Sequence, residues 1–169
     1  MTWALIAKLT GAVLLPTGVF IGYFYNKKRI SQRLARLDAL ADFAAFAGDQ
    51  IDRYLTPSPE IFRRYGAERL RTCLIGCDDA ENRILPGNME DFYRVLREGE
   101  FFFDGKKEIG EFCGNFGTSY REQELRACRD CSLALLTLRE KLGTELPAKL
   151  RNDTVLAFCG AVAAVIVLI

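Results

Sequence analysis

Charged side chains are almost confined to the middle of this chain. Residues 1–26 hold a single one, Lys8, and residues 154–169 hold none, so the segment between them carries every acidic residue and all the other basic ones. Sixteen residues without a charge are poorly suited to a water-facing surface, so each end needs an apolar environment. The sequence therefore predicts three segments: 1–26, a charged domain at 27–153, and 154–169.

The first apolar end has the length and the flanks of a membrane-spanning helix. Residues 9–25 form an uncharged run, and the basic sequence NKKRISQR follows directly. A helix of about 20 apolar residues crosses the hydrocarbon core of a bilayer. The alternative is a secretory signal, which instead places basic residues before the apolar run and a small-residue cleavage site after it. We expect residues 1–26 to span the membrane.

The second apolar end, residues 154–169, is a shorter candidate span. As a helix it is about 24 Å long, slightly less than a full bilayer. Lys149 and Arg151 precede it, and five basic residues follow the first span: Lys27, Lys28, Arg29, Arg33 and Arg36. The positive-inside bias then predicts a two-pass protein of the cell membrane with its domain in the cytoplasm. The alternative is that residues 154–169 pack as a core helix of a soluble domain.

Small residues recur at helix-packing spacing in both apolar ends. Gly18 and Gly22 form a G-x-x-x-G pattern, and Gly160 with Ala164 forms a looser version of it. Such residues let the backbones of membrane helices approach closely. We expect these positions to pack the two helices against each other or against a partner helix.

The middle segment has the spacing of long amphipathic helices. Apolar or small residues alternate by three and four along residues 34–55 and again along residues 128–142. The first seam consists of Leu34, Leu37, Ala41, Ala44, Gly48, Ile51 and Leu55, and the second of Cys128, Cys131, Leu135, Leu138 and Leu142. Strand-like alternation is absent from the sequence, so we expect an all-α fold, a helical bundle between the two membrane helices.

Turn and cap residues divide this bundle into two long helices and three or four short ones. The first long helix should continue from the membrane span and end near Leu55, because the sequence TPSP follows. The expected boundaries are Ser58 as the cap of a helix from 59 to about 77, Asn88 and Asp104 as caps of two short helices, and a last long helix over 120–142.

Composition excludes several classes of chemistry. The chain has no histidine, which removes the commonest general base and metal ligand near neutral pH. Its 23 basic and 22 acidic residues nearly balance, which argues against nucleic acid as a partner. We expect no catalytic residue, no cofactor and no enzymatic activity.

Two pairs of cysteines allow a metal or thiol site. Cys73 with Cys77 and Cys128 with Cys131 are four thiols that could hold zinc, but both pairs fall within helical patterns, where cysteine serves as a small apolar residue. We expect these thiols to be reduced and packed in the core. A metal or thiol sensor that uses the pairs is the alternative.

Two charged clusters remain. Asp78, Asp79 and Glu81 could bind a divalent ion, but their sequence is typical of a solvated turn. The basic run IFRRYGAERLRT contains Arg63, Arg64, Arg69 and Arg71. It is a candidate docking face for an acidic partner or anionic lipid, and the alternative is an ordinary charged helix face.

Short motifs along the chain resemble the stage III sporulation protein AB family of endospore-forming bacteria. KLTGAVLLPTGVFIGYFY is similar to the family's glycine-punctuated first span, and DQIDRYLTP to its first corner, here Tyr54, Thr56 and Pro57. FGTSYREQELRACRD is similar to a later corner, with Gly117 and Gln123 in the matching places. Phe116 stands where the family has Leu, and the Asp usual after that glycine is missing.

The resemblance implies a fold and a role. It implies a helical cytoplasmic domain similar to that of type II secretion platform proteins, held between two membrane helices on the mother-cell side. It further implies a non-enzymatic scaffold of the channel complex between mother cell and forespore, with a secretion-type ATPase and other membrane proteins of the complex as partners. An enzyme regulator without a role in sporulation remains open.

Overall fold

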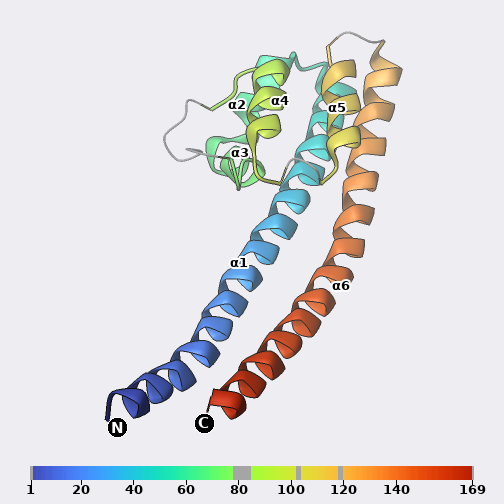
Figure 1. Ribbon diagram of the computed structural model, residues 1–169. Helices are drawn as coiled ribbons and strands as arrows, with labels where there is room; N and C mark the ends of the chain where they lie inside the picture. Colours follow the sequence, from blue (N-terminus) through green and yellow to red (C-terminus); the bar gives the residue numbers. More distant parts are fainter. Residues whose placement is uncertain (1, 78–84, 102–103, 118–119, 169) are drawn as a thin grey trace. The chain divides into compact units, whose positions relative to one another are not determined.

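A computed structural model shows that the described part of the chain is helical and contains no strand (Figure 1). The backbone is described for residues 2–77, 85–101, 104–117 and 120–168, and the side chains for the same ranges except residues 2–13, 15, 16, 167 and 168. The helices are α1 (Thr2–Tyr54), α2 (Ser58–Tyr65), α3 (Ala67–Cys73), α4 (Met89–Glu98), α5 (Lys106–Asn115) and α6 (Arg121–Leu168). The predicted all-α class is confirmed over these residues, which form two long helices and four short ones where three or four short ones were expected.

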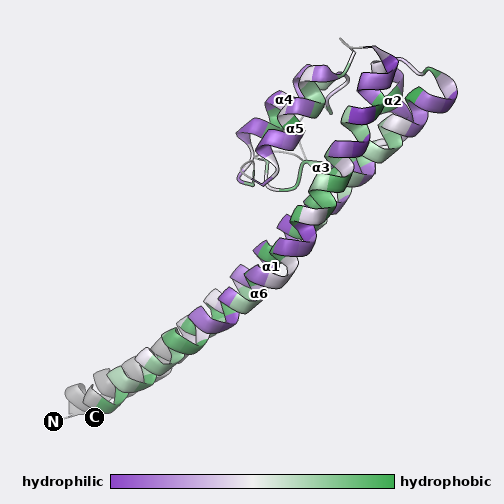
Figure 2. Ribbon diagram, turned by 90° about the vertical axis from the view of Figure 1, so that its right-hand side faces the viewer, coloured by the Kyte–Doolittle hydropathy of each residue, from purple (hydrophilic) through white to green (hydrophobic). Residues whose placement is uncertain are grey.

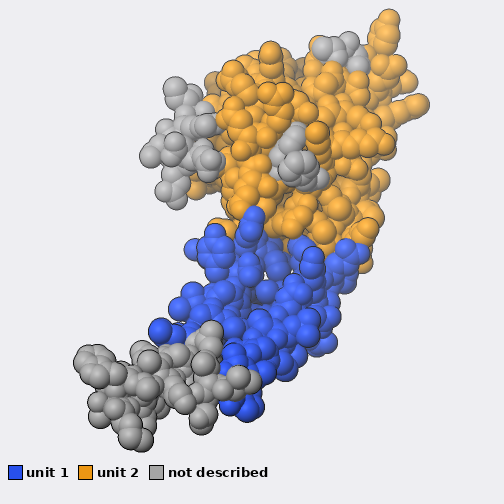
Figure 3. Space-filling view, viewed as in Figure 1, with its two compact units in different colours: residues 1–31, 143–169 blue, residues 32–142 orange. Residues whose placement is uncertain are grey.

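The chain forms two compact units (Figure 3). Unit 1 combines residues 1–31 with residues 143–169, and unit 2 comprises residues 32–142. These divisions fall five and eleven residues inside the predicted segment 27–153. Which residues lie in a membrane and which lie in water stays a prediction.

Within unit 2, α1 and α6 pack as an antiparallel pair along the two predicted seams. Ion pairs between Arg139 and Asp38 (3.0 Å) and between Arg121 and Asp52 (3.1 Å) mark the two ends of this contact. Gly48 lies opposite Cys128, where an added Cβ would come within 3.1 Å of the cysteine Cβ. The small residues in the middle of the first seam therefore let the two helices approach closely.

The core of unit 2 is centred on Phe43 of α1, which is 1% exposed. Its ring lies 5.2 Å from Phe62 and 5.0 Å from Tyr65, both on α2, measured between ring centroids. It also lies 5.0 Å from Phe92 on α4 and 6.3 Å from Phe112 on α5. Tilted and edge-to-face ring pairs at such separations stabilise beyond the apolar area they bury. One side chain thus contacts three of the four short helices.

The corner after α1 uses an unusual left-handed residue. Leu55 has φ 51°, the N–H of Thr56 donates to the carbonyl of Gln50 (3.3 Å), and the N–H of Leu55 donates to the carbonyl of Ile51 (3.3 Å). The bond from Leu55 to Ile51 is the 5→1 bond of the αL motif, which normally has glycine in the left-handed place because other residues are strained there. The predicted helix end near Leu55 is confirmed, at Tyr54.

Two predictions about the next helices are wrong. The helix expected from 59 to about 77 is broken at Gly66, whose φ of 91° no helix accepts, so that α2 and α3 are separate. Ser58 is the first residue of α2 rather than its cap, and Pro57 takes the cap position without a side-chain hydrogen bond. A serine one residue inside the helix no longer lies where its hydroxyl could accept from the first turn.

The caps of α4 and α5 differ from each other. Asn88 caps α4 as predicted, because its side-chain oxygen accepts from the N–H of Asp91 at 2.8 Å. Asp104 does not cap α5, since Gly105 takes that position and the Asp104 carboxylate instead pairs with Arg33 of α1. Figure 2 shows hydrophilic residues alternating with hydrophobic ones along α4 and α5, as expected for helices with one buried face.

The last helix is longer than predicted. We expected it to end near Leu142, apart from a second helix over 154–169, yet α6 runs unbroken from Arg121 to Leu168. It passes through Pro147, which has no N–H to offer the carbonyl four residues before it. Helical geometry on both sides of the proline is continuous, so the predicted break is absent. The expected continuity of α1 with its N-terminal apolar segment is confirmed.

Replacing Phe43 with Ala should lower the free energy of unfolding by about 3–5 kcal/mol, because it leaves a cavity where three helices meet. Phe43→Leu should cost less, since it keeps most of the volume. Chemical denaturation of the full chain in mild detergent, followed by circular dichroism, measures both. Leu136→Ala on α6, 45% exposed, is the control and should change stability by less than about 1 kcal/mol. Equal losses at positions 43 and 136 would contradict the central role of Phe43.

Candidate docking surface on α2 and α3

The four arginines predicted as a docking face are all exposed. α2 turns Ile61, Phe62 and Tyr65 into the core, which leaves Arg63 and Arg64 on its outer side. α3 buries Leu70 and Cys73 and exposes Arg69 and Arg71 between and beside them. We call Arg63, Arg64, Arg69 and Arg71 the arginine surface.

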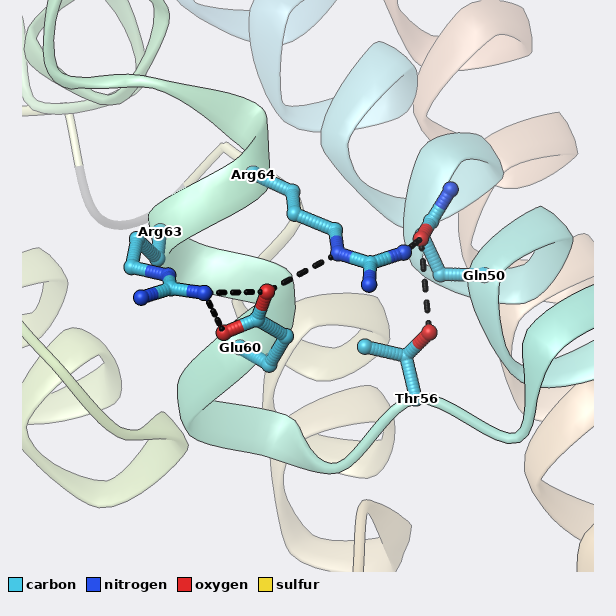
Figure 4. Close-up of polar contacts among 5 residues, drawn as sticks. All are labelled: Gln50, Thr56, Glu60, Arg63 and Arg64. Atoms are coloured by element: carbon cyan, nitrogen blue, oxygen red, sulfur yellow. Dashed lines mark hydrogen bonds and ion pairs between the residues drawn. The ribbon is translucent and has the colours of Figure 1, made fainter.

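Glu60 joins the two arginines of α2 (Figure 4). Its carboxylate accepts from Nη2 of Arg63 at 2.7 Å and from Nε of Arg64 at 3.0 Å. Arg64 also donates from Nη1 to the side-chain oxygen of Gln50 on α1, at 3.0 Å. Gln50 is buried, and the Thr56 hydroxyl lies 3.4 Å from the same oxygen. Arg64 therefore fixes α2 against α1, whereas Arg63 has its side chain 80% exposed.

The two arginines of α3 are held more loosely. Arg71 lies 3.6 Å from Glu68, whose side chain is 90% exposed. The Arg69 guanidinium lies 5.8 Å from the centre of the Tyr65 ring, within the range of a cation–π contact. The Tyr65 hydroxyl in turn donates to the Asp42 carboxylate at 2.9 Å, which orients the ring. Arg69 is thus positioned by the aromatic face of Tyr65.

The arginine surface has a surplus of positive charge. Four arginines stand against Glu60 and Glu68 on these two helices, which leaves a charge of +2. Each guanidinium has five N–H donors in a planar fork, and one or two contacts with a neighbouring carboxylate leave donors for another. The surface can therefore bind carboxylates or other anions presented by a partner.

Charge pairing on α2 makes stability depend on pH. Hydrogen bonds from Arg63 and then Arg64 hold the pKa of Glu60 below its ordinary 4.5. A carboxyl whose pKa is lower in the folded state stabilises the fold above its unfolded pKa, and this contribution is lost as the pH falls through the folded value.

Glu60→Gln should therefore lower the thermal midpoint at pH 7, where the native carboxylate is ionised. The difference from the unchanged protein should shrink as the pH falls below the ordinary glutamate pKa of 4.5, and vanish once the pH is below the lowered pKa that Glu60 has in the folded state. Thermal unfolding of the full chain over this pH range measures it. Glu140→Gln, which removes one exposed negative charge from α6, is the control. A difference for Glu60→Gln that does not depend on pH would show that the pairing contributes nothing.

The four cysteines of the two pairs are buried, as predicted. Cys73 ends α3, Cys77 follows it, and Cys128 and Cys131 lie on the seam of α6. Burial raises the pKa of Cys73, Cys128 and Cys131 to about 12, so these thiols stay protonated at neutral pH. Over the residues that are described, no group of three or more Cys, Asp, Glu or His side chains is placed to hold a metal ion.

The family-like corners lie at two turns of unit 2. Tyr54 and Pro57 flank the α1–α2 corner, and Thr56 is buried inside it. Gly117 has φ 79° and donates its N–H to the Glu124 carboxylate at 2.7 Å. Gln123 lines a groove of about 410 Å³ between α5 and α6. These residues therefore shape the turns.

The acidic cluster of Asp78, Asp79 and Glu81 lies outside the described residues.

The small residues of the apolar ends have open space beside them, as far as the described side chains show. A Cβ added at Gly18, Gly22 or Gly160 would meet no atom within 4 Å, and Ala164 is exposed. Contact of these positions with a partner helix stays a prediction.

The predicted spans are only partly covered by the described side chains. Residues 1–13, 15, 16 and 167–169 fall outside them. Among the described residues, no helix has an apolar stretch long enough to cross a membrane.

The prediction that Arg33 and Arg36 belong to the basic flank of the first span is wrong. Arg36 is 1% exposed, and Arg33 makes a two-point ion pair with Asp104. Arg36 donates from Nε to the carbonyl of Cys73 at 3.3 Å, and burial lowers its pKa. Its Nη2 has no hydrogen-bond partner in the structure as described. A signal was present, because Arg36 lies seven residues before Phe43 and hence on the same buried face.

Comparison of the chain with protein-family models, with curated proteins and with solved structures finds no match.

Proposed function

We propose that this chain is a non-enzymatic, membrane-anchored scaffold of the channel complex between mother cell and forespore in endospore formation. Its helical unit 2 docks a cytoplasmic secretion-type ATPase through the arginine surface. Its apolar ends place that unit beside the membrane on the mother-cell side, where other membrane proteins of the complex contact them. The motifs around Tyr54, Gly117 and Gln123 supply the link to endospore formation.

The observation that carries the anchoring is the apolar exterior of unit 1. Large apolar side chains there are 40–72% exposed: Leu14, Phe20, Ile21, Phe24, Tyr25, Val155, Leu156, Phe158, Val162 and Ile166. Soluble monomers rarely expose contiguous apolar surface on this scale, because each square ångström left in water forgoes about 25 cal/mol. Hydrocarbon removes that penalty, and it favours helices because they satisfy their own backbone polar groups.

Docking is supported by how the arginines are held. Arg64 is fixed through Gln50 and Glu60, so it contributes to the fold, while Arg63, Arg69 and Arg71 are exposed and rest on few contacts. Exposed cations on a rigid helical support attract and orient an acidic partner. The chain has no histidine, which is the commonest acid–base catalyst in enzymes, and this favours a binding role.

The docking test neutralises Arg63, Arg69 and Arg71 to Gln together and keeps Arg64 because it holds α2 to α1. Reversal to Glu is avoided, since a carboxylate at position 63 would repel Glu60. Binding to the purified secretion-type ATPase of the same genome, measured by surface plasmon resonance at physiological salt, should weaken about tenfold, mainly through slower association.

The matched control carries the same change of charge on α4 and α5, as Arg94→Gln, Arg97→Gln and Lys107→Gln, all exposed in the native chain. This variant should bind as the unchanged protein does. Equal affinities for both triple variants would remove the arginine surface from the interface, and no binding by the unchanged chain would overturn the docking role itself.

Cys159 tests the anchoring. It is exposed on α6, so in water it would react with a membrane-impermeant maleimide. In native membranes we expect it to stay unlabelled until the membrane is dissolved by detergent, because the reagent and the thiolate are both excluded from hydrocarbon. Ser31→Cys, at an exposed position after the first span, should react from the cytoplasmic face alone. Labelling of Cys159 in intact membranes, read by peptide mass mapping, would contradict the second span.

A further inference from the structure

The two helical segments of unit 1 lie side by side and antiparallel (Figures 1 and 2). The residues that line a cavity of about 620 Å³ between the two segments show which residues of α1 and α6 lie at the same level. The cavity is lined by Thr17, Val19, Phe20 and Tyr23 of α1 and by Thr154, Val155 and Phe158 of α6. Residues 17–23 are therefore level with residues 154–158.

This register brings two groups of cations to the same level. Along a helix, Lys28 lies about 12 Å beyond Phe20, and Lys149 lies about 9 Å from Val155 in the same direction, because the segments are antiparallel. We name Lys27, Lys28, Arg29, Lys149 and Arg151 the basic collar. All five residues are exposed. Arg33 and Arg36 do not belong to it, since Arg33 is only partly exposed and Arg36 is buried.

The basic collar surrounds both segments. Successive helical residues are about 100° apart, so Lys27, Lys28 and Arg29 cover most sides of α1, and Lys149 and Arg151 point to opposite sides of α6. The acidic residues at this level are Glu145 and Asp153, which leaves a net charge of +3 for residues 27–31 and 143–153. A partner that meets the collar thus encounters positive charge from nearly every direction.

The position of the collar matches the headgroup layer of a bilayer. The exposed apolar surface ends at Tyr25 on α1 and at Val155 on α6. The nearest collar residues are Lys27, two positions after Tyr25, and Arg151, four positions before Val155, which is about 3 and 6 Å along the helices. The polar layer on each side of a bilayer is about 5–7 Å thick. If the apolar surface lies in hydrocarbon, the five cations lie among the phosphates.

We propose that the basic collar binds the phosphate groups of anionic phospholipids and that the cavity below it receives one of their acyl chains. The inference rests on the proposed anchoring in a membrane. A zwitterionic lipid brings an amine that cancels its phosphate, whereas an anionic lipid brings an uncompensated negative charge. The cavity is bounded by the rings of Phe20, Tyr23 and Phe158, so it suits a hydrocarbon chain.

The test measures the preference of the full chain for anionic over zwitterionic lipid. The chain is reconstituted into vesicles, and the relative association constant of spin-labelled phosphatidylglycerol over spin-labelled phosphatidylcholine is obtained by electron paramagnetic resonance. Each cation near a charged surface is worth about fivefold in association at low salt. The unchanged chain should prefer the anionic lipid at least about fivefold, and 0.5 M salt should weaken that preference by screening.

Variants of the chain test which residues produce the preference for anionic lipid. Changing all five collar residues to Gln should bring the ratio close to one, and Lys149→Gln with Arg151→Gln should lower it part of the way, because cations on α1 remain. The matched control, Arg97→Gln with Lys107→Gln, removes two exposed cations of unit 2 and should leave the ratio unchanged. An unchanged ratio in the five-residue variant, or an equal fall in the control, would overturn the collar.

A second measurement distinguishes lipid binding by the basic collar from anchoring by the apolar surface. Vesicles made of phosphatidylcholine alone should retain the chain after alkaline extraction, since the apolar surface alone holds it there. Retention with no preference for either lipid overturns the collar and leaves the anchor intact. Release from neutral vesicles overturns both.

Discussion

The contact of the Phe43 ring with Phe62, Phe92 and Phe112 is the interaction on which unit 2 depends. The short helices α2, α4 and α5 have eight or ten residues each, too few to be stable alone in water. Each gains its order by burying an aromatic ring against the same side chain of α1. The arginine surface on α2 is positioned through this contact, because Ile61, Phe62 and Tyr65 are what turn its outer side toward solvent.

The buried charge of Arg36 opposes the packing of unit 2. Arg36 is enclosed and donates a hydrogen bond to the Cys73 carbonyl, and desolvation opposes its charge. The nearby pair of Arg33 with Asp104 offsets part of that cost, since the Asp104 carboxylate also attracts Arg36. The same pair ties α1 to the turn before α5. The buried guanidinium of Arg36 thus links α1 to the end of α3, while the rings around Phe43 join α1 to α2, α4 and α5.

The two proposed binding surfaces differ in how they hold their cations. On the arginine surface, Glu60 and the Tyr65 ring set the directions of the guanidinium groups, which suits recognition of a shaped protein partner. In the basic collar, cations surround two helices beside an apolar exterior, which suits a fluid layer of phosphates. A scaffold beside a membrane needs both kinds of contact, one specific and one general.

The sequence by itself determined what depends on neighbours within a few turns of helix. It predicted the all-α class, the seams of α1 and α6, the end of α1 near Leu55, the Asn88 cap and the exposure of the arginines, because periodicity and capping are local properties. Only the tertiary structure determined that Arg33 pairs with Asp104, which lies 71 residues away, and that Arg36 is buried. It also carried α6 through Pro147 and joined Arg64 of α2 to Gln50 of α1. These outcomes depend on which helices meet, and a single sequence does not record the contacts between distant segments.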